Sequence, residues 1–251
     1  MFPISSWRAL AAVFILLATM AGIDAFLVQL DSPDAARDLA STGVLALLVV
    51  AWPWWGPRVL LGLIPASKIC LEQSYTGRVA AAVESLKLPN SSITRVVVYR
   101  SEKLSAVTTG RRGDSLIAIS TGLLDALGTR QLRAAIAHEL GHAEGNHMIL
   151  TAGYLATLLF AKSLFGALGL PITLALLLAY LALLRRNEVD ADRRAADRVG
   201  NEDVVDLLLA LKVTLKEPAC LDWPAMSLLS THPGYRTRAA RVRDRRLSSL
   251  V

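Results

Sequence analysis

Residues 138–142 read His-Glu-Leu-Gly-His. Histidines four residues apart lie on one face of a helix, one turn from each other, so both imidazoles can reach a single metal ion. The glutamate between them, Glu139, can then take a proton from a water held at that ion. The spacing therefore predicts a helix that carries a hydrolytic zinc site. Because the same pattern also occurs by chance on core helices, the sequence has to supply further ligands.

The chain around this motif is rich in apolar residues, and they lie in blocks. Hydrophobic residues make up 53% of the 251 residues and charged residues only 19%, whereas soluble domains carry about 25% charged residues. Segments 9–30, 39–57 and 148–184 contain at most one charge each. A span needs about 20 apolar residues, so we expect one span in each of the first two blocks and a helical hairpin in the third, about four transmembrane helices in all.

The distribution of basic residues predicts how these spans are oriented. Arg8 precedes the first span, Arg58 and Lys68 follow the second, and Arg185 follows the last. Because basic residues mark the cytoplasmic side of a membrane, we expect a multi-pass protein of the cell (inner) membrane, with both termini and the metal motif in the cytoplasm. The first block could also be a signal peptide, although its apolar run continues past the weak cleavage site at 19–21.

The net charge of +6 fits this orientation, so we expect a lipid bilayer as a partner and no nucleic acid. The arginine-rich segment 236–246 has the spacing of a helix face near lipid headgroups. The two cysteines, Cys70 and Cys220, are too few for a disulfide framework and are expected to be buried thiols.

The predicted fold class is α+β, with a mostly helical cytoplasmic zincin domain that carries a small antiparallel sheet. The expected segments are two membrane helices in 1–64, a membrane hairpin in 148–184, and one metalloprotease domain formed by 65–147 and 185–251. Within that domain, β-branched runs and helical periodicity predict strands at 94–99, 104–109 and 115–120 and helices at 72–87, from 129 onward, and at 185–199, 202–216 and 235–247.

A catalytic zinc site keeps three protein ligands and a water, so the histidine pair needs a third ligand. The best candidate is Glu188, on a helix that begins where the hairpin ends. Asp192 lies one turn later on the same face and can hold a ligand histidine through a hydrogen bond. His147 is not expected to be a ligand, and His232 is either structural or part of the site.

Several motifs, in order, resemble the HtpX-type membrane zinc metalloendopeptidases, the group that includes the CAAX prenyl proteases. The matching stretches, from about residue 70 to the end, are Leu104 to Gly110, Thr121 to Leu124, the metal helix, the hairpin, Asn187 to Asp192, and Thr231 to Pro233 with Arg238.

The resemblance implies a catalytic role for Glu139 and the zinc (Zn2+) ligands His138, His142 and Glu188. It also implies that the backbone of a substrate polypeptide binds to the extended segment Ala106, Val107 and Thr108. His232 and Arg238 are then expected near the cleft, where they could stabilise the oxyanion. One departure stands out: the family usually has Asn-Ala-Phe-Ala where this chain has Ser-Ala-Val-Thr at 105–108, which affects substrate preference.

The expected activity is zinc-dependent endopeptidase cleavage in the quality control of membrane or misfolded proteins. Two alternatives remain open: an inactive membrane signalling or scaffold protein with a protease-like fold, and a CAAX-type peptide-processing protease. An intramembrane protease is disfavoured because the metal helix carries Arg130, Arg133 and Glu144. The sequence does not determine the oligomeric state.

Overall fold

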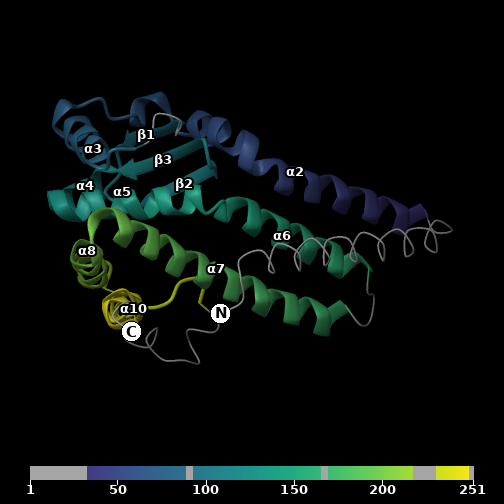
Figure 1. Cartoon of the computed structure of the whole chain (residues 1–251). Coiled ribbons are helices and arrows are strands. Elements are labelled where there is room, and N and C mark those ends of the chain that lie inside the picture. The colour runs from purple at the N-terminus through teal and green to yellow at the C-terminus, as the bar shows by residue number, and fades with distance from the viewer. Residues whose placement is uncertain (1–32, 89–92, 165–168, 217–229, 249–251) are drawn as a thin grey trace. The chain divides into compact units, whose positions relative to one another are not determined.

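The computed structural model describes residues 33–88, 93–164, 169–216 and 230–248 (Figure 1). The chain divides into two compact units. The first comprises Met1–Ala51 and Ala152–Tyr180, and the second comprises Trp52–Thr151 and Leu181–Val251. The segment expected to form the first span, 9–30, and Cys220 both lie outside the described residues. Every candidate site residue lies in the second unit.

The described part of the first unit consists of apolar helix segments. They belong to α2 (Pro33–Leu63), α6 (His147–Leu164) and α7 (Gly169–Val199). Within the described residues, one helix segment, Ala40–Leu63, is long and apolar enough to cross a membrane, and His147–Phe160 is a shorter apolar helix. The segment expected to form a hairpin thus contains helical residues on both sides of 165–168, and α7 continues without a break through residues 184 and 185.

The second unit contains a three-stranded sheet of β1 (Ile93–Tyr99), β2 (Ala106–Arg111) and β3 (Asp114–Ser120), in the order β1-β3-β2. β2 and β3 form an antiparallel hairpin whose turn includes Gly113 with φ of 87°. β1, however, pairs with β3 in parallel. The predicted antiparallel sheet is therefore wrong, and the sheet is mixed.

The order of the strands explains this difference. β1 and β2 follow one another in the chain but are not neighbours in the sheet. β3, which comes after β2, lies between them. β3 is consequently hydrogen-bonded along both edges, and its residues Leu116, Ile117, Ala118 and Ile119 are at most 2% exposed. Alternation in a sequence marks strands, but it does not determine which strands pair.

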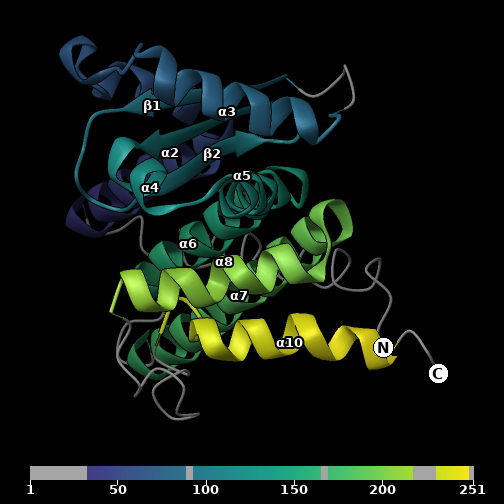
Figure 2. The ribbon, with the colours of Figure 1, turned by 90° about the vertical axis from the view of Figure 1, so that its left-hand side faces the viewer.

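Helices pack around the sheet. The remaining helices are η1 (Ala66–Lys68), α3 (Gln73–Ser85), α4 (Thr121–Ala126), α5 (Thr129–Glu144), α8 (Asn201–Thr214) and α10 (Tyr235–Ser248). α5 lies between the sheet and α8, and α10 packs on the far side of α8 (Figure 2). The buried residues Leu132, Ile136 and Leu140 of α5 and Val204 and Leu208 of α8 belong to one apolar core.

The close approach of α5 and α7 depends on Gly141. A Cβ at this position would lie 2.9 Å from the carbonyl oxygen and 3.0 Å from the Cα of Ala191, and 3.3 Å from the Cβ of Arg194. Two of these three atoms belong to backbone, which cannot move aside alone. A side chain at 141 would therefore push the two helices apart.

We expect Gly141→Ala to destabilise the purified protein by about 1–3 kcal/mol, because overpacking at a helix contact forces a backbone shift. Unfolding in detergent followed by circular dichroism measures it. Gly77→Ala in α3 is the matched control, since a Cβ there meets nothing within 4 Å and alanine favours a helix interior by about 0.5–1 kcal/mol. Equal stability of the two variants would contradict the tight helix contact.

Candidate active site

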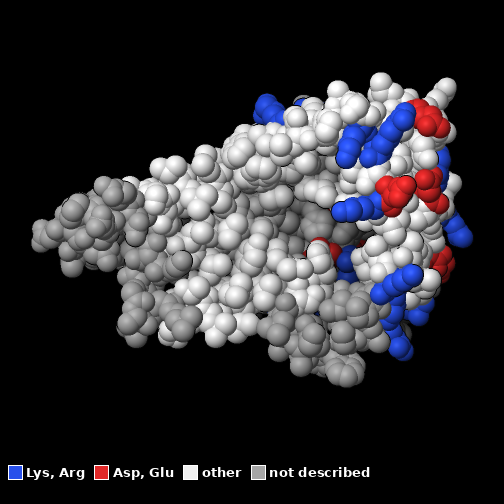
Figure 3. Space-filling model, turned by 180° about the vertical axis from the view of Figure 1, so that it is seen from behind, with Lys and Arg blue, Asp and Glu red and all other residues white. Residues whose placement is uncertain are grey.

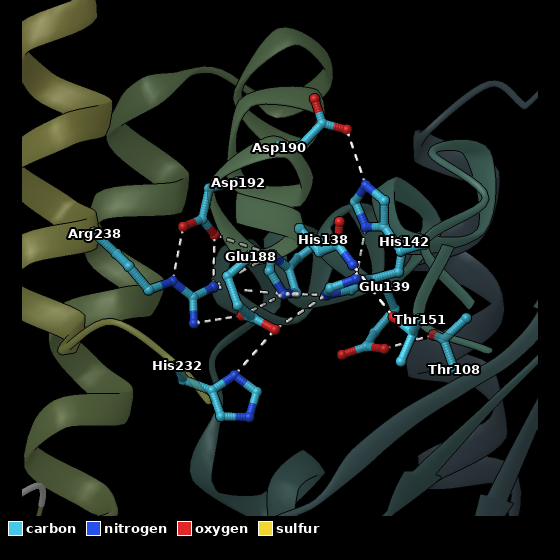
Figure 4. A network of polar contacts seen from close by, with 12 residues as sticks. Thr108, His138, Glu139, His142, Thr151, Glu188, Asp190, Asp192, His232 and Arg238 are labelled. Atoms are coloured by element: carbon cyan, nitrogen blue, oxygen red, sulfur yellow. Dashed lines mark hydrogen bonds and ion pairs between the residues drawn. The ribbon is translucent and has the colours of Figure 1, made fainter. Parts of the chain in front are cut away.

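Helix α5 presents the motif as its spacing predicts. Leu132, Ile136 and Leu140 face the core, and the next positions round the helix direct His138, Glu139 and His142 to one side (Figure 4). The Nε2 atoms of His138 and His142 lie 3.1 Å apart. The two rings meet edge to face, with centroids 4.8 Å apart.

Glu188 of α7 completes a triangle of possible metal ligands. Its Oε2 lies 3.6 Å from Nε2 of His138, and its Oε1 lies 3.5 Å from Nε2 of His142. Within the part of the chain that the structure describes, these three residues form the group suited to holding a metal ion. The structure thus brings together the three residues that the sequence proposed as ligands.

Asp192, one turn further along α7, lies behind His138. Its Oδ1 is 3.0 Å from Nδ1 of His138, so Nε2 of that ring is left to face the triangle. Arg238 of α10 donates to both oxygens of Asp192, at 2.7 and 2.8 Å, and pairs with Oε2 of Glu188 at 2.8 Å. Asp192 and Arg238 are 2% and 5% exposed, which makes these charge-assisted bonds strong.

The electrostatics of the site favour a cation at the triangle. Burial alone would lower the pKa of His138, but hydrogen bonds with Asp192 and Glu188 raise it to about 10. Burial would likewise raise the pKa of Asp192, but the charge of Arg238 lowers it to about 2. Burial would also raise the pKa of Glu188, but hydrogen bonds with His138 and His232 hold it below its usual value. Both carboxylates therefore remain ionised and stabilise positive charge beside the histidines.

Glu139 occupies a different environment from Glu188. Burial raises the pKa of the Glu139 carboxyl above its usual value, and the hydroxyl of Thr108 opposes this by donating to Oε2 at 2.5 Å. Glu139 makes no ion pair with Arg238 in the described residues, whereas Glu188 does. The environments of the two glutamates therefore suit different roles: that of Glu139 suits a general base, and that of Glu188 suits a metal ligand.

The other predicted residues also gather here. His232, in the segment before α10, places Nδ1 3.0 Å from Oε1 of Glu188, and its side chain is 64% exposed. Ala106, Val107 and Thr108 form the start of β2, and Val107 is 46% exposed. The side chain of Thr108, expected only to present backbone, contacts Glu139 directly.

Sequence reasoning missed two residues beside His142. The Nδ1 of His147 lies 2.9 Å from Nδ1 of His142, and the Nε2 of His147 lies 3.0 Å from Oδ2 of Asp190. His147 was visible as a histidine near the motif, but a separation of five residues does not place two side chains together on one helix. Asp190 carried no signal beyond its place between Glu188 and Asp192.

Comparisons with known proteins agree with this geometry. The profile of Peptidase family M48 matches residues 72–246. A protease HtpX homolog of Neisseria meningitidis (strain FAM18) is 31% identical over 192 residues, covering 62% of this chain and 67% of the relative. Protease HtpX of Vibrio atlanticus is 30% identical over 189 residues, covering 59% and 65%.

A solved structure shows the same fold. Ste24p of S. mikatae superposes with a TM-score of 0.59 at 16% identity, over 96% of this chain and 66% of that one. The chain thus spans about two thirds of the length of the relatives it matches. The matched profile covers both ligand helices and Arg238, and with the HtpX relatives it shows that the chain belongs to peptidase family M48, as an HtpX-type metalloprotease.

Proposed function

We propose that the protein is a membrane-anchored endopeptidase that binds zinc through His138, His142 and Glu188 and uses Glu139 as its general base. The observation that carries the proposal is the spacing of the candidate ligand atoms. The two Nε2 atoms lie 3.1 Å apart, and the carboxylate of Glu188 places Oε2 3.6 Å from Nε2 of His138 and Oε1 3.5 Å from Nε2 of His142. A tetrahedral zinc ion with bonds of about 2.0–2.1 Å separates its ligand atoms by about 3.3 Å.

The donor set also suits zinc rather than a harder cation. Two imidazole nitrogens and one carboxylate are common catalytic zinc ligands, whereas magnesium and calcium select oxygen ligands. When bound, zinc would polarise the scissile carbonyl and lower the pKa of a water. Glu139, raised in pKa by burial, would accept a proton from that water and deliver it to the leaving amine.

The structure suggests separate roles for the two residues expected at the oxyanion. His232 is exposed and touches Glu188, so its ring can reach a substrate, and we assign it to stabilising the oxyanion. The guanidinium nitrogens of Arg238 all lie within 2.8 Å of carboxylate oxygens. We therefore assign Arg238 to holding Glu188 and Asp192 in place.

We assign substrate binding to the outer edge of β2. In the order β1-β3-β2 this strand is at the edge of the sheet. The amide of Ser120 donates to the carbonyl of Ser105, so by alternation the backbone groups of Val107 face β3 and those of Ala106 and Thr108 face outward. An extended peptide can add to such an edge, next to Glu139.

We further propose that the enzyme lies in the inner membrane with about four spans and its catalytic domain in the cytoplasm. Leu45, Leu47 and Leu48 of α2 and Leu174 of α7 are 48–70% exposed. Residues 40–51, 152–161 and 169–180 contain no charged residue, and Figure 3 shows a broad surface without charged side chains. Exposed apolar patches of this kind suit lipid.

The biological role that fits these features is quality control of membrane or misfolded proteins. Binding through a strand edge reads the substrate's backbone and makes few demands on its side chains. Unfolded segments offer such unpaired backbone. The apolar segments of α2, α6 and α7 would keep the enzyme at the bilayer, where such segments arise.

The roles of the two glutamates can be separated by substitution. We expect Glu139→Gln to keep a full equivalent of zinc and lose nearly all turnover of casein, because an amide cannot accept the proton. Glu188→Ala should lose zinc at chelator concentrations that the parent withstands, together with its activity. Metal analysis and casein cleavage by detergent-purified protein measure both. A Glu188→Ala variant that holds zinc as tightly as the parent would place the third ligand elsewhere.

The substrate edge is tested by a proline at Ala106. Ala106→Pro removes an outward-facing amide without touching the pairing with β3, and proline is tolerated on edge strands. We expect about tenfold or greater loss of kcat/KM for casein with zinc content unchanged. Ala106→Ser, which keeps the amide, is the control and should cleave like the parent. Equal turnover by the two variants would show that this edge does not bind substrate.

The topology is tested with a reporter enzyme that is active only outside the cytoplasm. Fused after residue 34, it should be active, because the charge pattern places the first loop outside. Fused after residue 251, it should be inactive. Activity of the second fusion would overturn the cytoplasmic orientation.

A further inference from the structure

The two histidines of the motif are held from behind in different ways. His138 meets a carboxylate directly, since its Nδ1 lies 3.0 Å from Oδ1 of Asp192 (Figure 4). His142 reaches a carboxylate only through another ring. Its Nδ1 contacts Nδ1 of His147 at 2.9 Å, and Nε2 of His147 contacts Oδ2 of Asp190 at 3.0 Å.

The protons of this chain of contacts can be assigned from the role of His142 as a ligand. For Nε2 of His142 to hold a metal ion, the proton of the neutral ring must lie on Nδ1. That Nδ1 then donates to Nδ1 of His147, so the proton of His147 lies on Nε2 and is donated to Asp190. Every ring nitrogen has a partner of the right kind when both rings are neutral.

Asp190 is in turn held by a cation. The Nε of Arg194, one turn further along α7, donates to Oδ2 of Asp190 at 2.7 Å. Asp192 is braced by Arg238 in the same manner. A carboxylate of α7, itself paired with an arginine, therefore stands behind each of the two histidines. Asp192 contacts His138 directly, whereas His147 bridges the gap between Asp190 and His142.

The backbone after α5 is built to bring His147 to this place. Side chains five residues apart on a continuous helix point about 140° away from each other. Here α5 ends at Glu144, and Asn146 adopts a left-handed φ of 51° before α6 begins at His147. The amide of Arg112 donates to Oδ1 of Asn146 at 2.9 Å, which ties this break to the β2–β3 turn.

The packing around the imidazole of His147 also indicates that the ring is held in one position. His147 is 5% exposed, although it is polar and stands at the end of a helix. A Cβ at Gly145 would collide with its imidazole. The imidazole of His147 therefore fits closely against Gly145, and any side chain at position 145 would displace it. Hydrogen bonds to both of its ring nitrogens fix its orientation.

We propose that His147, Asp190 and Arg194 form an orienting relay that fixes the ring of His142 for metal binding. His147 and Asp190 are thus positioning residues, which touch neither substrate nor metal. Partners that orient a ligand histidine typically contribute about 10- to 100-fold to metal affinity or activity. The relay rests on the proposed zinc site, and α7 then supplies one ligand and orients the other two.

Zinc retention tests the relay. Detergent-purified parent, His147→Leu and Asp190→Ala are titrated with a chelator, and the cobalt-substituted forms are compared by visible absorption. We expect both variants to bind the metal about 10- to 100-fold more weakly and to show altered cobalt spectra. His147→Gln, whose amide can accept from His142 and donate to Asp190, should recover most of the affinity.

Two further variants separate failure of the relay from failure of the proposed zinc site. Glu144→Gln removes an α5 carboxylate that pairs with Arg198 and touches no ligand, so it should retain zinc like the parent. His142→Ala should lose zinc; if it does not, or if the parent binds none, the proposed function itself fails. If the parent binds zinc and His147→Leu and Asp190→Ala hold it equally tightly with the parent's cobalt spectrum, the relay is refuted.

Discussion

The site depends on burying two carboxylates side by side. Glu188 and Asp192 are 8% and 2% exposed, and buried charges cost several kcal/mol each unless they are paired. Arg238 lies within 2.8 Å of both, but one cation cannot balance two anions. The remaining negative charge faces the Nε2 atoms of His138 and His142, where a proton on His138, whose pKa is raised to about 10, or a metal cation in its place completes the balance. α10, which brings Arg238, is consequently part of the centre although it lies far along the chain from α5.

Much of this site was predictable because it obeys helical spacing. His138 and His142, and likewise Glu188 and Asp192, are four residues apart, so their side chains share a helix face wherever the helices pack. The structure deviates from the prediction where the backbone leaves regular geometry or where pairing is long-range. His147 reaches His142 only because Asn146 breaks the helix, and the parallel pairing of β1 with β3 depends on strand order, which local patterns do not encode.

The chain departs from the usual family motif beside Glu139, the proposed general base. Thr108 stands where the family usually has alanine, and its hydroxyl donates to Glu139 at 2.5 Å. The same residue presents its backbone to the outer edge of β2, so the strand that would bind substrate also holds the base. If a substrate peptide pairs with the backbone of Thr108, as proposed, substrate binding would be linked to the position of Glu139 by a contact that alanine could not make.

X-ray absorption at the zinc edge of the purified protein tests whether a zinc ion is held by two imidazoles and one carboxylate. We expect one zinc per chain with nitrogen and oxygen neighbours at about 2.0–2.1 Å and the multiple-scattering pattern of two imidazoles. A sulfur neighbour at about 2.3 Å, a single imidazole, or an unchanged spectrum in Glu188→Ala would contradict it.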